Sequence, residues 1–338
     1  MRFLWIVVVV LLATLVATMG NAPSATGALQ KPAYSSGDRW VYDLRGSLDA
    51  FPGTNGSDVG TFSFGLVGRV EVAILGADQA LVDGVSTSVV RVETRASGFL
   101  NGTFSAPGLP GTGTVSGTFS SLTTDLWETQ AYLPVASEGT TTYLATISFL
   151  VTIDFSASIR LNATTAYASI PAFDLDVGES ATTPYTTDVL ANTTATFSGE
   201  TFTSENVTSL SSTWTREVLR ETTVAVDAGM FSAYEMNQTL TVFPGLAGFV
   251  PTNRANETAY FSNSAGNYVK RDAYANGTRV AEISLVSYSY GPGSSGLSIV
   301  DLSLIVGVPI VALLAVLVWL RRRKKKAPAP PEGEPRAR

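Results

Sequence analysis

The sequence predicts a mainly β protein of antiparallel, curved sheets, arranged as two half-barrel or sandwich-like units, with an N-terminal signal helix and one C-terminal transmembrane helix. Three observations lead to this prediction. Apolar and polar residues alternate with a period of two in many segments, no sustained 3.6-residue period occurs between residues 32 and 298, and the chain is rich in Thr, Ser, Val, Tyr and Phe. Alternation places successive side chains on opposite faces of a strand, and β-branched and aromatic residues favour strands.

The N-terminus has the layout of a secretory signal peptide. Arg2 is followed by an almost wholly apolar stretch over residues 3–16 and then by small residues. We predict a signal peptide over residues 1–27, cleaved either after Gly20 or within residues 22–28. An uncleaved second anchor stays open as an alternative, because the apolar stretch is only slightly shorter than a membrane-spanning helix.

The period-two alternation is longest over residues 147–163, where every odd-numbered residue is apolar. Seventeen residues would extend ~55 Å as one strand, so we expect a bend or a long, curved sheet there. Asn276-Gly277, between two strand-like segments, predicts a tight hairpin turn. The turn-rich segment 107–117 predicts a loop. Further strands are predicted over residues 39–44, 60–75, 80–94, 113–124, 195–202, 214–226, 231–243, 257–262, 268–275 and 278–290.

Two short motifs occur twice. The segment 36–40, which contains Gly37-Asp38, has an echo in 177–180, which contains Gly178-Glu179. The segment 81–85 has an echo in 225–230. The offsets, 141 and 144 residues, are consistent with an internal duplication that gives one β unit over residues 28–168 and another over residues 169–290. Chance similarity in a sequence of low diversity is the open alternative.

The C-terminal part predicts a membrane anchor. Residues 302–320 carry no charge, and nineteen residues make ~29 Å of helix, which matches the hydrocarbon core of a bilayer. We predict a stalk over residues 291–298, a transmembrane helix over 299–320 and a basic, Pro-rich cytoplasmic tail over 321–338. The cationic stop-transfer residues, which resist crossing a membrane, are Arg321, Arg322, Arg323, Lys324, Lys325 and Lys326.

Charge and missing residue types exclude several functions. Residues 21–320 carry 13 Lys/Arg and 26 Asp/Glu, whereas residues 321–338 carry eight Lys/Arg and two Glu. An acidic exterior disfavours nucleic acid as a partner. The chain has no Cys and no His, which excludes disulfides, His- or Cys-based catalysis and thiolate or imidazole metal sites.

Asparagine glycosylation is the chemistry that the sequence supports best. Eight of the twelve Asn residues begin N-x-Ser/Thr sequons, whereas the 74 Ser and Thr among 338 residues would produce ~3 by chance. The eight predicted sites are Asn55, Asn101, Asn162, Asn192, Asn206, Asn237, Asn256 and Asn276. All lie between the signal peptide and the anchor, on the side where glycosylation would occur.

Carboxylates and aromatic residues offer weaker candidates. Asp174, Asp176 and Glu179 have a spacing that could help to hold Ca²⁺, but a solvated strand face fits the segment better. Many aromatic residues could line a groove for sugar or lipid, yet such residues more often fill cores. The residues that could do either are Trp40, Tyr42, Trp127, Tyr132, Trp214, Tyr234, Tyr260, Tyr268, Tyr288 and Tyr290. We predict no catalytic residue, no metal and no cofactor.

The second half of the sequence, with the motifs at 226–234, 259–262 and 266–270 and the closing strand to Tyr290, resembles half-barrel β proteins related to periplasmic lipoprotein carriers. The arrangement of signal peptide, Thr-rich β exterior, single helix and basic tail is similar to that of archaeal cell-surface proteins. The first resemblance implies an apolar concavity that holds acyl chains.

These observations predict a non-enzymatic, membrane-anchored cell-surface glycoprotein whose β ectodomain acts in adhesion, envelope structure or protein contact. A carrier of lipid or another apolar ligand is the alternative, and an extracellular hydrolase is a remote one. The expected location is the cell membrane, with a single pass, the ectodomain outside and the C-terminus cytoplasmic. The expected partners are bilayer lipids, with envelope proteins, glycans or an apolar ligand outside the cell.

Overall fold

A computed structural model describes residues 28–49, 61–82, 84–105, 112–148, 152–197, 199–239, 255–275 and 277–291. The predicted signal peptide, transmembrane helix and basic tail lie outside these residues, as do Asn55, Asn276 and the stop-transfer residues Arg321 to Lys326. The described residues contain no helix that is long and apolar enough to cross a membrane.

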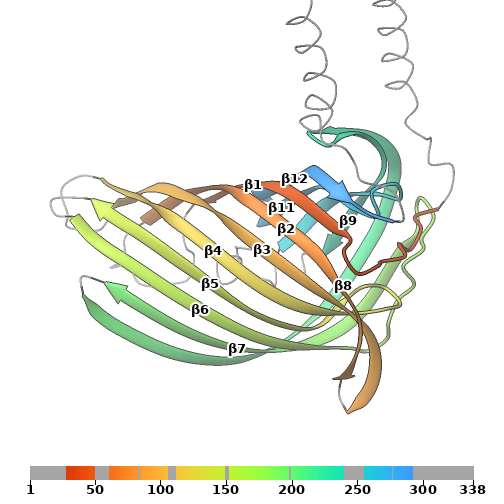
Figure 1. The fold of residues 1–338 in the computed structure, drawn as a ribbon, viewed down its shortest axis with the longest axis horizontal. Coiled ribbons are helices and arrows are strands. Elements are labelled where there is room, and N and C mark those ends of the chain that lie inside the picture. The colour runs from red at the N-terminus through yellow and green to blue at the C-terminus, as the bar shows by residue number, and fades with distance from the viewer. Residues whose placement is uncertain are drawn as a thin grey trace, which may run out of the picture. The chain divides into compact units, whose positions relative to one another are not determined.

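Twelve antiparallel strands form one closed barrel (Figure 1). Each strand pairs with its neighbours in the sequence, and β1 pairs with β12 to close the ring. The strands are β1 (Arg39–Asp49), β2 (Thr61–Val82), β3 (Val85–Ser105), β4 (Gly113–Glu128), β5 (Pro134–Ser148), β6 (Thr152–Tyr167), β7 (Ser180–Phe197), β8 (Glu200–Val226), β9 (Gly229–Thr239), β10 (Ala255–Ser262), β11 (Asn267–Ala275) and β12 (Thr278–Ser289).

The mainly β, antiparallel prediction is therefore confirmed, but the expected arrangement of two half-barrel or sandwich-like units is wrong. β6 and β7 flank the expected boundary, and they pair continuously from Phe155 with Phe197 to Tyr167 with Tyr185. β1 and β12, the outermost strands of the two expected units, also pair with each other. The edge strand of an open sheet has backbone N–H and C=O groups without partners. Here the edges of the two six-strand halves pair with each other, β6 with β7 and β12 with β1, and this pairing supplies the missing partners.

The side chains that face inward form the core because of the period-two alternation. Trp40, Tyr42 and Leu44 of β1 are buried, and inward residues of the other strands join them in one large hydrophobic cluster. Directly paired residues share a face, so one inward row can be followed across ten strands. This row runs through Arg271, Ile283, Leu44, Gly68, Gly98, Phe119, Tyr143, Ala157, Ala195 and Phe202.

The two motifs that echo each other adopt the same turn. Asp38 N–H donates to the Ser35 carbonyl, and Glu179 N–H donates to the Asp176 carbonyl. Each acidic side chain also accepts the backbone N–H three residues earlier, at 2.7 Å and 2.9 Å. Gly37 and Gly178 take φ values of 97° and 90°. The same local structure begins β1 and β7, as expected if the chain is an internal duplication of six strands.

The segment 147–163, for which we expected a bend or a long, curved sheet, is a hairpin. Ile147 of β5 pairs with Ile153 of β6, and Ser148 pairs with Thr152. Three residues separate the two strands, so odd-numbered positions face inward both before and after the reversal. The alternation therefore continues through the turn, and the sequence pattern alone shows no interruption.

Other reversals differ in how well the sequence signals them. The predicted hairpin at Asn276-Gly277 is confirmed, because Ala275 pairs with Thr278 and Gly277 has a φ of 78°. The predicted strands over residues 80–94 and 195–202 each contain a reversal, between β2 and β3 and between β7 and β8. Each of these two turns contains two residues, so Val82 pairs with Val85 and Phe197 with Glu200, and the inward positions change between even and odd numbers across the turn.

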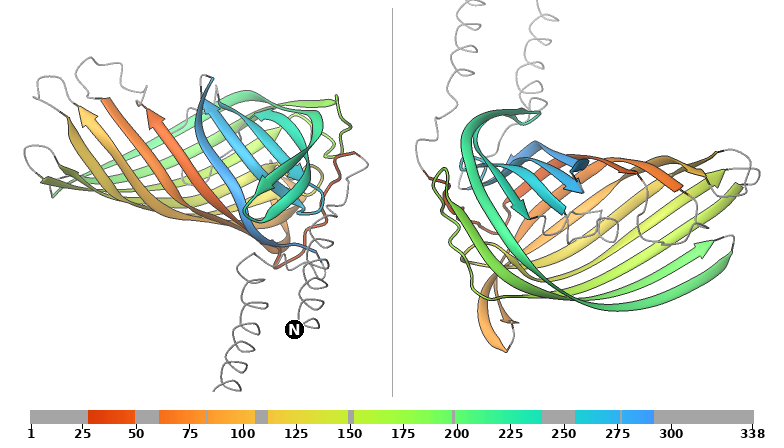
Figure 2. Two further views of the ribbon diagram at one scale, coloured as in Figure 1. Left: turned by 90° about the horizontal axis from the view of Figure 1, so that it is seen from above. Right: turned by 180° about the vertical axis from the view of Figure 1, so that it is seen from behind.

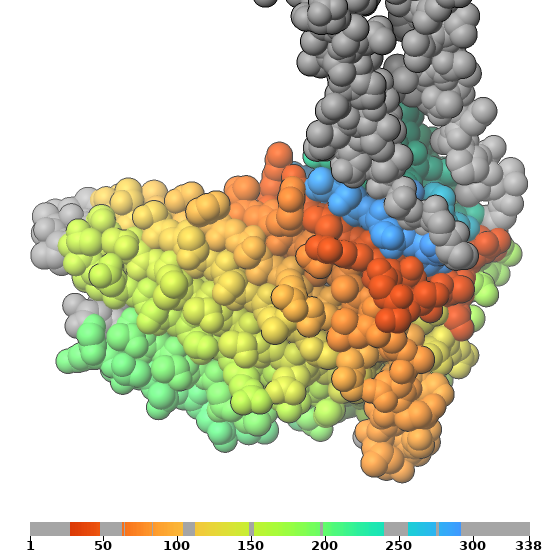
Figure 3. All heavy atoms as spheres, viewed as in Figure 1, coloured from red at the N-terminus to blue at the C-terminus, as the bar shows by residue number. Residues whose placement is uncertain are grey.

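Both ends of the described chain lie at the same end of the barrel. We call the end where β1 begins and β12 ends the terminal rim, because both ends of the described chain lie there. Ala33 N–H donates to the Tyr290 hydroxyl, and Gly291 N–H donates to Asp38 Oδ1. In Figure 3 the first described residues, in red, lie against β12, in blue. We call the opposite end the far rim.

The wall of the barrel is uneven. The long strands β2–β8 form one extended curved wall, whereas the short strands β9–β12 lie together toward the terminal rim (Figure 2). Of the residues of β8, only 216–226 pair with β9, which pairs with β10 on its other side. In the part of the chain that the structure describes, residues 200–215 of β8 therefore have a partner strand only on the β7 side.

Candidate ligand-binding cavity in the barrel

A cavity of about 120 Å³ lies inside the barrel toward the terminal rim. Three segments outside the strands contribute to its lining: Tyr34 from the N-terminal segment, Tyr132 from the β4–β5 connection and Phe173 from the β6–β7 connection. Aromatic, apolar and charged residues of the strands complete it. These are Tyr42, Val70, Val72, Thr94, Asp125, Trp127, Pro134, Trp214, Arg216, Gln238, Phe261, Asn267, Tyr268, Arg271 and Ile283, with Ala131 and Leu133 from the β4–β5 connection.

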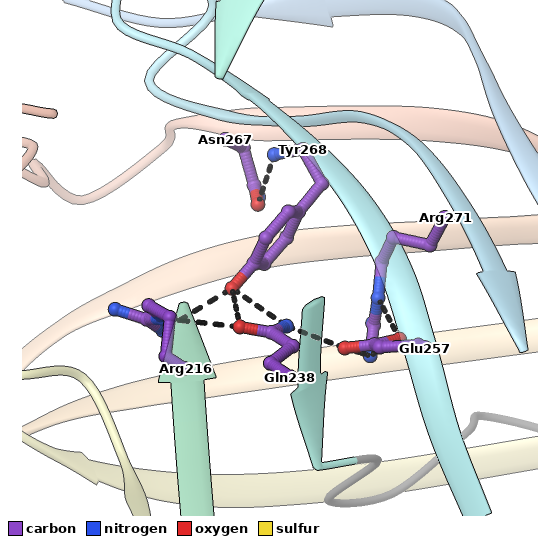
Figure 4. A network of polar contacts seen from close by, with 6 residues as sticks. All are labelled: Arg216, Gln238, Glu257, Asn267, Tyr268 and Arg271. Atoms are coloured by element: carbon purple, nitrogen blue, oxygen red, sulfur yellow. Dashed lines mark hydrogen bonds and ion pairs between the residues drawn. The ribbon is translucent and has the colours of Figure 1, made fainter. Parts of the chain in front are cut away.

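Arg216 is the most informative residue of this lining. It is 4% exposed, and its guanidinium group lies 4.9 Å from the ring centre of Phe173 and 5.0 Å from that of Trp214. Its Nε donates to Gln238 Oε1 at 3.0 Å, and its Nη2 donates to the Tyr268 hydroxyl at 3.3 Å (Figure 4). Nη1 is buried and has no hydrogen-bond partner.

Glu257 and Arg271 form the second part of the same network. Glu257 is fully buried, and Arg271 contacts both of its carboxylate oxygens, at 2.8 Å and 2.9 Å. Gln238 Nε2 donates to Glu257 Oε1 and also contacts the Tyr268 hydroxyl at 3.1 Å. The charge of Glu257 is thus compensated within this bidentate pair, which is the strong geometry for guanidinium and carboxylate.

Asp125 lines the cavity from β4 on the other side of the barrel and accepts a hydrogen bond from Ser137 Oγ. Burial raises the pKa of Asp125 to about 6, and the hydrogen bond from Ser137 opposes this shift. The side chain retains some accessible surface because it borders the cavity, but it is removed from bulk water. The raised pKa follows because a low-dielectric surrounding disfavours the charged carboxylate.

Aromatic side chains close the cavity toward the terminal rim. The rings of Tyr34 and Tyr132 are 4.6 Å apart, and those of Tyr34 and Trp40 are 5.6 Å apart. The Tyr132 hydroxyl donates to the Pro32 carbonyl at 2.8 Å, which ties the N-terminal segment to the barrel. Burial raises the pKa of Tyr34 well above its ordinary value, so the phenol stays neutral and acts as an apolar wall with one polar atom.

Of the ten aromatic residues that the sequence suggested for either a groove or the core, five line the cavity. Tyr42, Trp127, Tyr132, Trp214 and Tyr268 line the cavity, whereas Trp40, Tyr234, Tyr260, Tyr288 and Tyr290 are absent from its lining. The charged and polar residues Arg216, Gln238, Glu257 and Arg271 were missed by the sequence analysis. One signal could have found Arg216: it lies on the same face as Trp214 and Val218, where the alternation predicts apolar residues.

The candidate calcium ligands do not form a metal site. Asp174 Oδ1 accepts the Lys31 N–H at 2.6 Å, and Glu179 accepts the Asp176 N–H within the turn that precedes β7. No group of three or more acidic side chains with the geometry to hold a metal ion occurs among the described residues.

The described glycosylation sites are accessible to different degrees. Asn101, Asn162, Asn206, Asn237 and Asn256 are exposed, and Asn192 is partly buried. Asn162 pairs with Glu138 and Asn192 with Arg160, so both face outward, opposite to the buried core. Asn206 faces inward, because its partner Ala191 lies on the inner face of β7, but this part of β8 is open to solvent.

A second depression on the described surface has a volume of about 460 Å³ and is lined by residues of β4, β5, β6 and β7 and by Gly199 of the β7–β8 turn, near the far rim. Ser, Thr and Gly residues make up most of its lining, with Leu144, Phe155 and Asp154 among them. It contains no cluster of charged groups and no buried polar group without a partner.

Comparison with known proteins gives little. No family model and no curated protein matches the sequence. One similar solved structure is a β-barrel-like protein of the domain of unknown function DUF1849 from Brucella abortus, with a TM-score of 0.32 and 9% identity over 77% of this chain and 100% of that chain. This weak likeness carries no functional argument. The expected resemblances to lipoprotein carriers and to archaeal surface proteins remain predictions.

Proposed function

We propose that this protein is a non-enzymatic, membrane-anchored glycoprotein whose β-barrel is displayed on the outside of the cell for contact with other envelope components. The C-terminal apolar segment over residues 302–320 would anchor it, and the basic residues after this segment would stay in the cytoplasm.

The position of the two chain ends supports this proposal most strongly. Both described ends lie at the terminal rim, where Gly291 contacts Asp38 and Tyr290 contacts Ala33. The predicted anchor begins only eight residues after Gly291. The described chain therefore leaves the barrel at the terminal rim, on the side from which the predicted anchor follows in the sequence.

Three of the described sequons lie toward the far rim, because Asn101, Asn192 and Asn206 are within six residues of the end of β3, the end of β7 and the start of β8. Asn162 is nearer the terminal-rim end of β6, and Asn237 and Asn256 belong to the short strands β9 and β10. Among the described residues, none of the connections at the terminal rim contains a sequon. Glycans need space and solvent, which a surface close to a bilayer provides poorly.

Protease treatment of intact cells, followed by mass spectrometry of the membrane fraction, tests the proposal. We expect external protease to release glycosylated peptides from the barrel and to leave residues 321–338 uncut. Sequon peptides without any glycan, or cleavage of only the basic tail, would contradict it.

A carrier of apolar ligands is the second candidate, and one observation favours it. Several apolar side chains on the inner face of β6–β8 are not fully buried. Phe155, Ile159 and Leu161 of β6 are partly buried. Phe202 and Leu210 of β8 are 59% and 38% exposed. Exposed apolar residues on a concave face are typical of lipid-binding surfaces. Mass spectrometry of the protein extracted in mild detergent would show a stoichiometric lipid if this function is correct, and no bound lipid if it is not.

A further inference from the structure

The barrel interior contains a buried guanidinium group, that of Arg216, which lines the same cavity as Asp125 but has no carboxylate in direct contact. Arg216 forms no ion pair among the residues that the structure describes, although it is almost fully buried. Glu257 uses both oxygens for Arg271. The pKa shift of Asp125 arises from burial and from Ser137, without a contribution from Arg216. Burying a charge is costly unless it is paired, so an unpaired guanidinium in this place requires an explanation.

The free hydrogen-bonding capacity of Arg216 is directed to one side. Nε and Nη2 are occupied by Gln238 and Tyr268, whereas Nη1 points away from both residues (Figure 4). Guanidinium N–H groups on one edge are arranged to bind two oxygens of a planar anion. The guanidinium group lies over the rings of Phe173 and Trp214, and these cation–π contacts hold it in place before any ligand binds.

The walls of the cavity select for an apolar body next to the anionic group. Trp127, Tyr132, Val72 and Ile283 line the same space as Arg216, and the volume is about 120 Å³. A water molecule takes ~30 Å³ in the liquid, so the cavity has room for only a few heavy atoms. An inorganic anion is hydrated on all sides, and the aromatic walls could not replace the hydrogen bonds of the water that it loses. A short hydrocarbon chain forms no such hydrogen bonds, so its contact with these walls carries no such cost.

We propose that this cavity binds a small organic monocarboxylate, whose carboxylate pairs with Arg216 and whose short apolar part contacts Trp127, Tyr132 and Phe173. The site does not depend on the proposed membrane orientation or on glycosylation, and it is separate from the exposed apolar face of β6–β8. The preorganised guanidinium group supplies the specificity for carboxylate, and the volume of about 120 Å³ fits a short chain.

Titration of the full chain, purified in a maltoside detergent, tests this inference. The probes are butyrate, palmitate, chloride and inorganic phosphate at constant pH and ionic strength. The readouts are tryptophan fluorescence, to which Trp214 and Trp127 contribute, and the thermal unfolding temperature. We expect saturable binding of butyrate and an increase in thermal stability, because a ligand that binds only the folded state stabilises it. Chloride and phosphate should show no saturable effect at the same concentrations.

Arg216→Gln should weaken butyrate binding by about tenfold or more, since it removes a charge-assisted hydrogen bond. Arg220→Gln is the matched control, because Arg220 lies on the same strand, is exposed and pairs with Glu235. It should leave binding unchanged. Arg216→Lys, which keeps the charge, should retain saturable but weaker binding and shows that folding is not the cause of a loss.

Four results would overturn the inference: no saturable binding of butyrate, equal binding to the Arg216→Gln variant, equal affinity for chloride or phosphate, or binding of palmitate alone. The last result would assign the carboxylate chemistry to a long-chain lipid at the exposed apolar face instead of this cavity.

Discussion

The ion pair between Glu257 and Arg271 shows how much a single buried residue contributes to this barrel. Glu257 is fully buried, and its contacts with Arg271 and Gln238 join β9, β10 and β11 near the cavity. Replacing one partner of such a pair leaves the other charge buried and uncompensated, which costs more than losing an exposed pair.

Glu257→Gln is therefore expected to lower the free energy of unfolding by about 3 kcal/mol or more. Glu138→Gln serves as the control, because Glu138 and Arg160 form a pair whose side chains are 58% and 66% exposed. Such exposed pairs contribute roughly 0–1 kcal/mol. Chemical denaturation of both variants in detergent measures the difference, and equal effects would show that burial does not govern the strength of the pair.

The buried carboxyl group of Asp125 should make the stability of the protein depend on pH. Its pKa is about 6 in the folded protein and 3.8 in an ordinary carboxyl group, so the folded state binds more protons between these values. The protonation of Asp125 therefore stabilises the folded protein at low pH. Because of this group, the free energy of unfolding should fall by on the order of 1–3 kcal/mol as the pH rises from about 4 to about 6.

Asp125→Asn removes this contribution, because the amide does not titrate and can still accept a hydrogen bond from Ser137. The variant should be more stable than the natural protein above pH 6 and similar to it near pH 4. Unfolding curves of the two proteins across pH 4–8 provide the measurement. A constant difference between the proteins over this range would contradict the raised pKa.

Among the elements, β2, β3 and β4 approach one another closely at two glycines. Gly68 and Gly98 are direct cross-strand partners, and Phe119 of β4 is paired with Gly98. A Cβ atom on Gly98 would lie 2.2 Å from the Val67 carbonyl oxygen and 2.8 Å from the Phe119 ring. The two glycines thus leave room for an aromatic ring on the inner wall, which compensates for their own lack of side chains.

Gly98→Ala should destabilise the barrel by about 2 kcal/mol or more, because backbone atoms and not a mobile side chain would have to move. Gly65→Ala on β2 is the matched control. Its Cβ would meet only the Asn101 carbonyl oxygen, at 3.6 Å, and alanine generally stabilises a strand by about 0.5–1 kcal/mol relative to glycine. Thermal unfolding of both variants should give opposite signs, and a loss of stability in both would disprove the steric explanation.

For the whole molecule, the contact between β1 and β12 decides whether the chain forms one barrel or two units. Asp43 and Ser284 are paired across this contact, and both side chains face outward. Paired residues on neighbouring strands have Cβ atoms about 4.5–5.5 Å apart, which is close to the separation that a disulfide requires. The natural chain contains no Cys, so a new pair would react without competition.

The double variant Asp43→Cys with Ser284→Cys is expected to form an intramolecular disulfide under mild oxidation, visible as faster migration in a non-reducing gel. Asp43→Cys combined with Ser120→Cys on β4 should not form one, because these positions belong to strands that do not pair. A folded double variant that remains reduced at positions 43 and 284 would show that the barrel does not close at β1 and β12.

At the scale of the site, the sequence predicted which residue types would gather but not how they would be placed. The aromatic residues at 42, 127, 132, 214 and 268 were all recognised as candidates for a lining, and the structure brings them to one cavity. The partners of Arg216 could not be predicted, because Gln238 and Tyr268 lie 22 and 52 residues away and meet only when β8, β9 and β11 curve around the same interior.

The sequence by itself determined the β class, the alternation that separates inner from outer faces, the hairpin at residues 276–277 and the repeat of one motif around Gly37 and Gly178, since these depend on local side-chain and backbone preferences. Only the tertiary structure decided that the halves form one closed barrel, that both described chain ends share a rim, and that Arg216 is buried without an acidic partner. Strand pairing joins residues far apart in the sequence, and neither a period of two nor a turn motif states which distant edge a strand will meet.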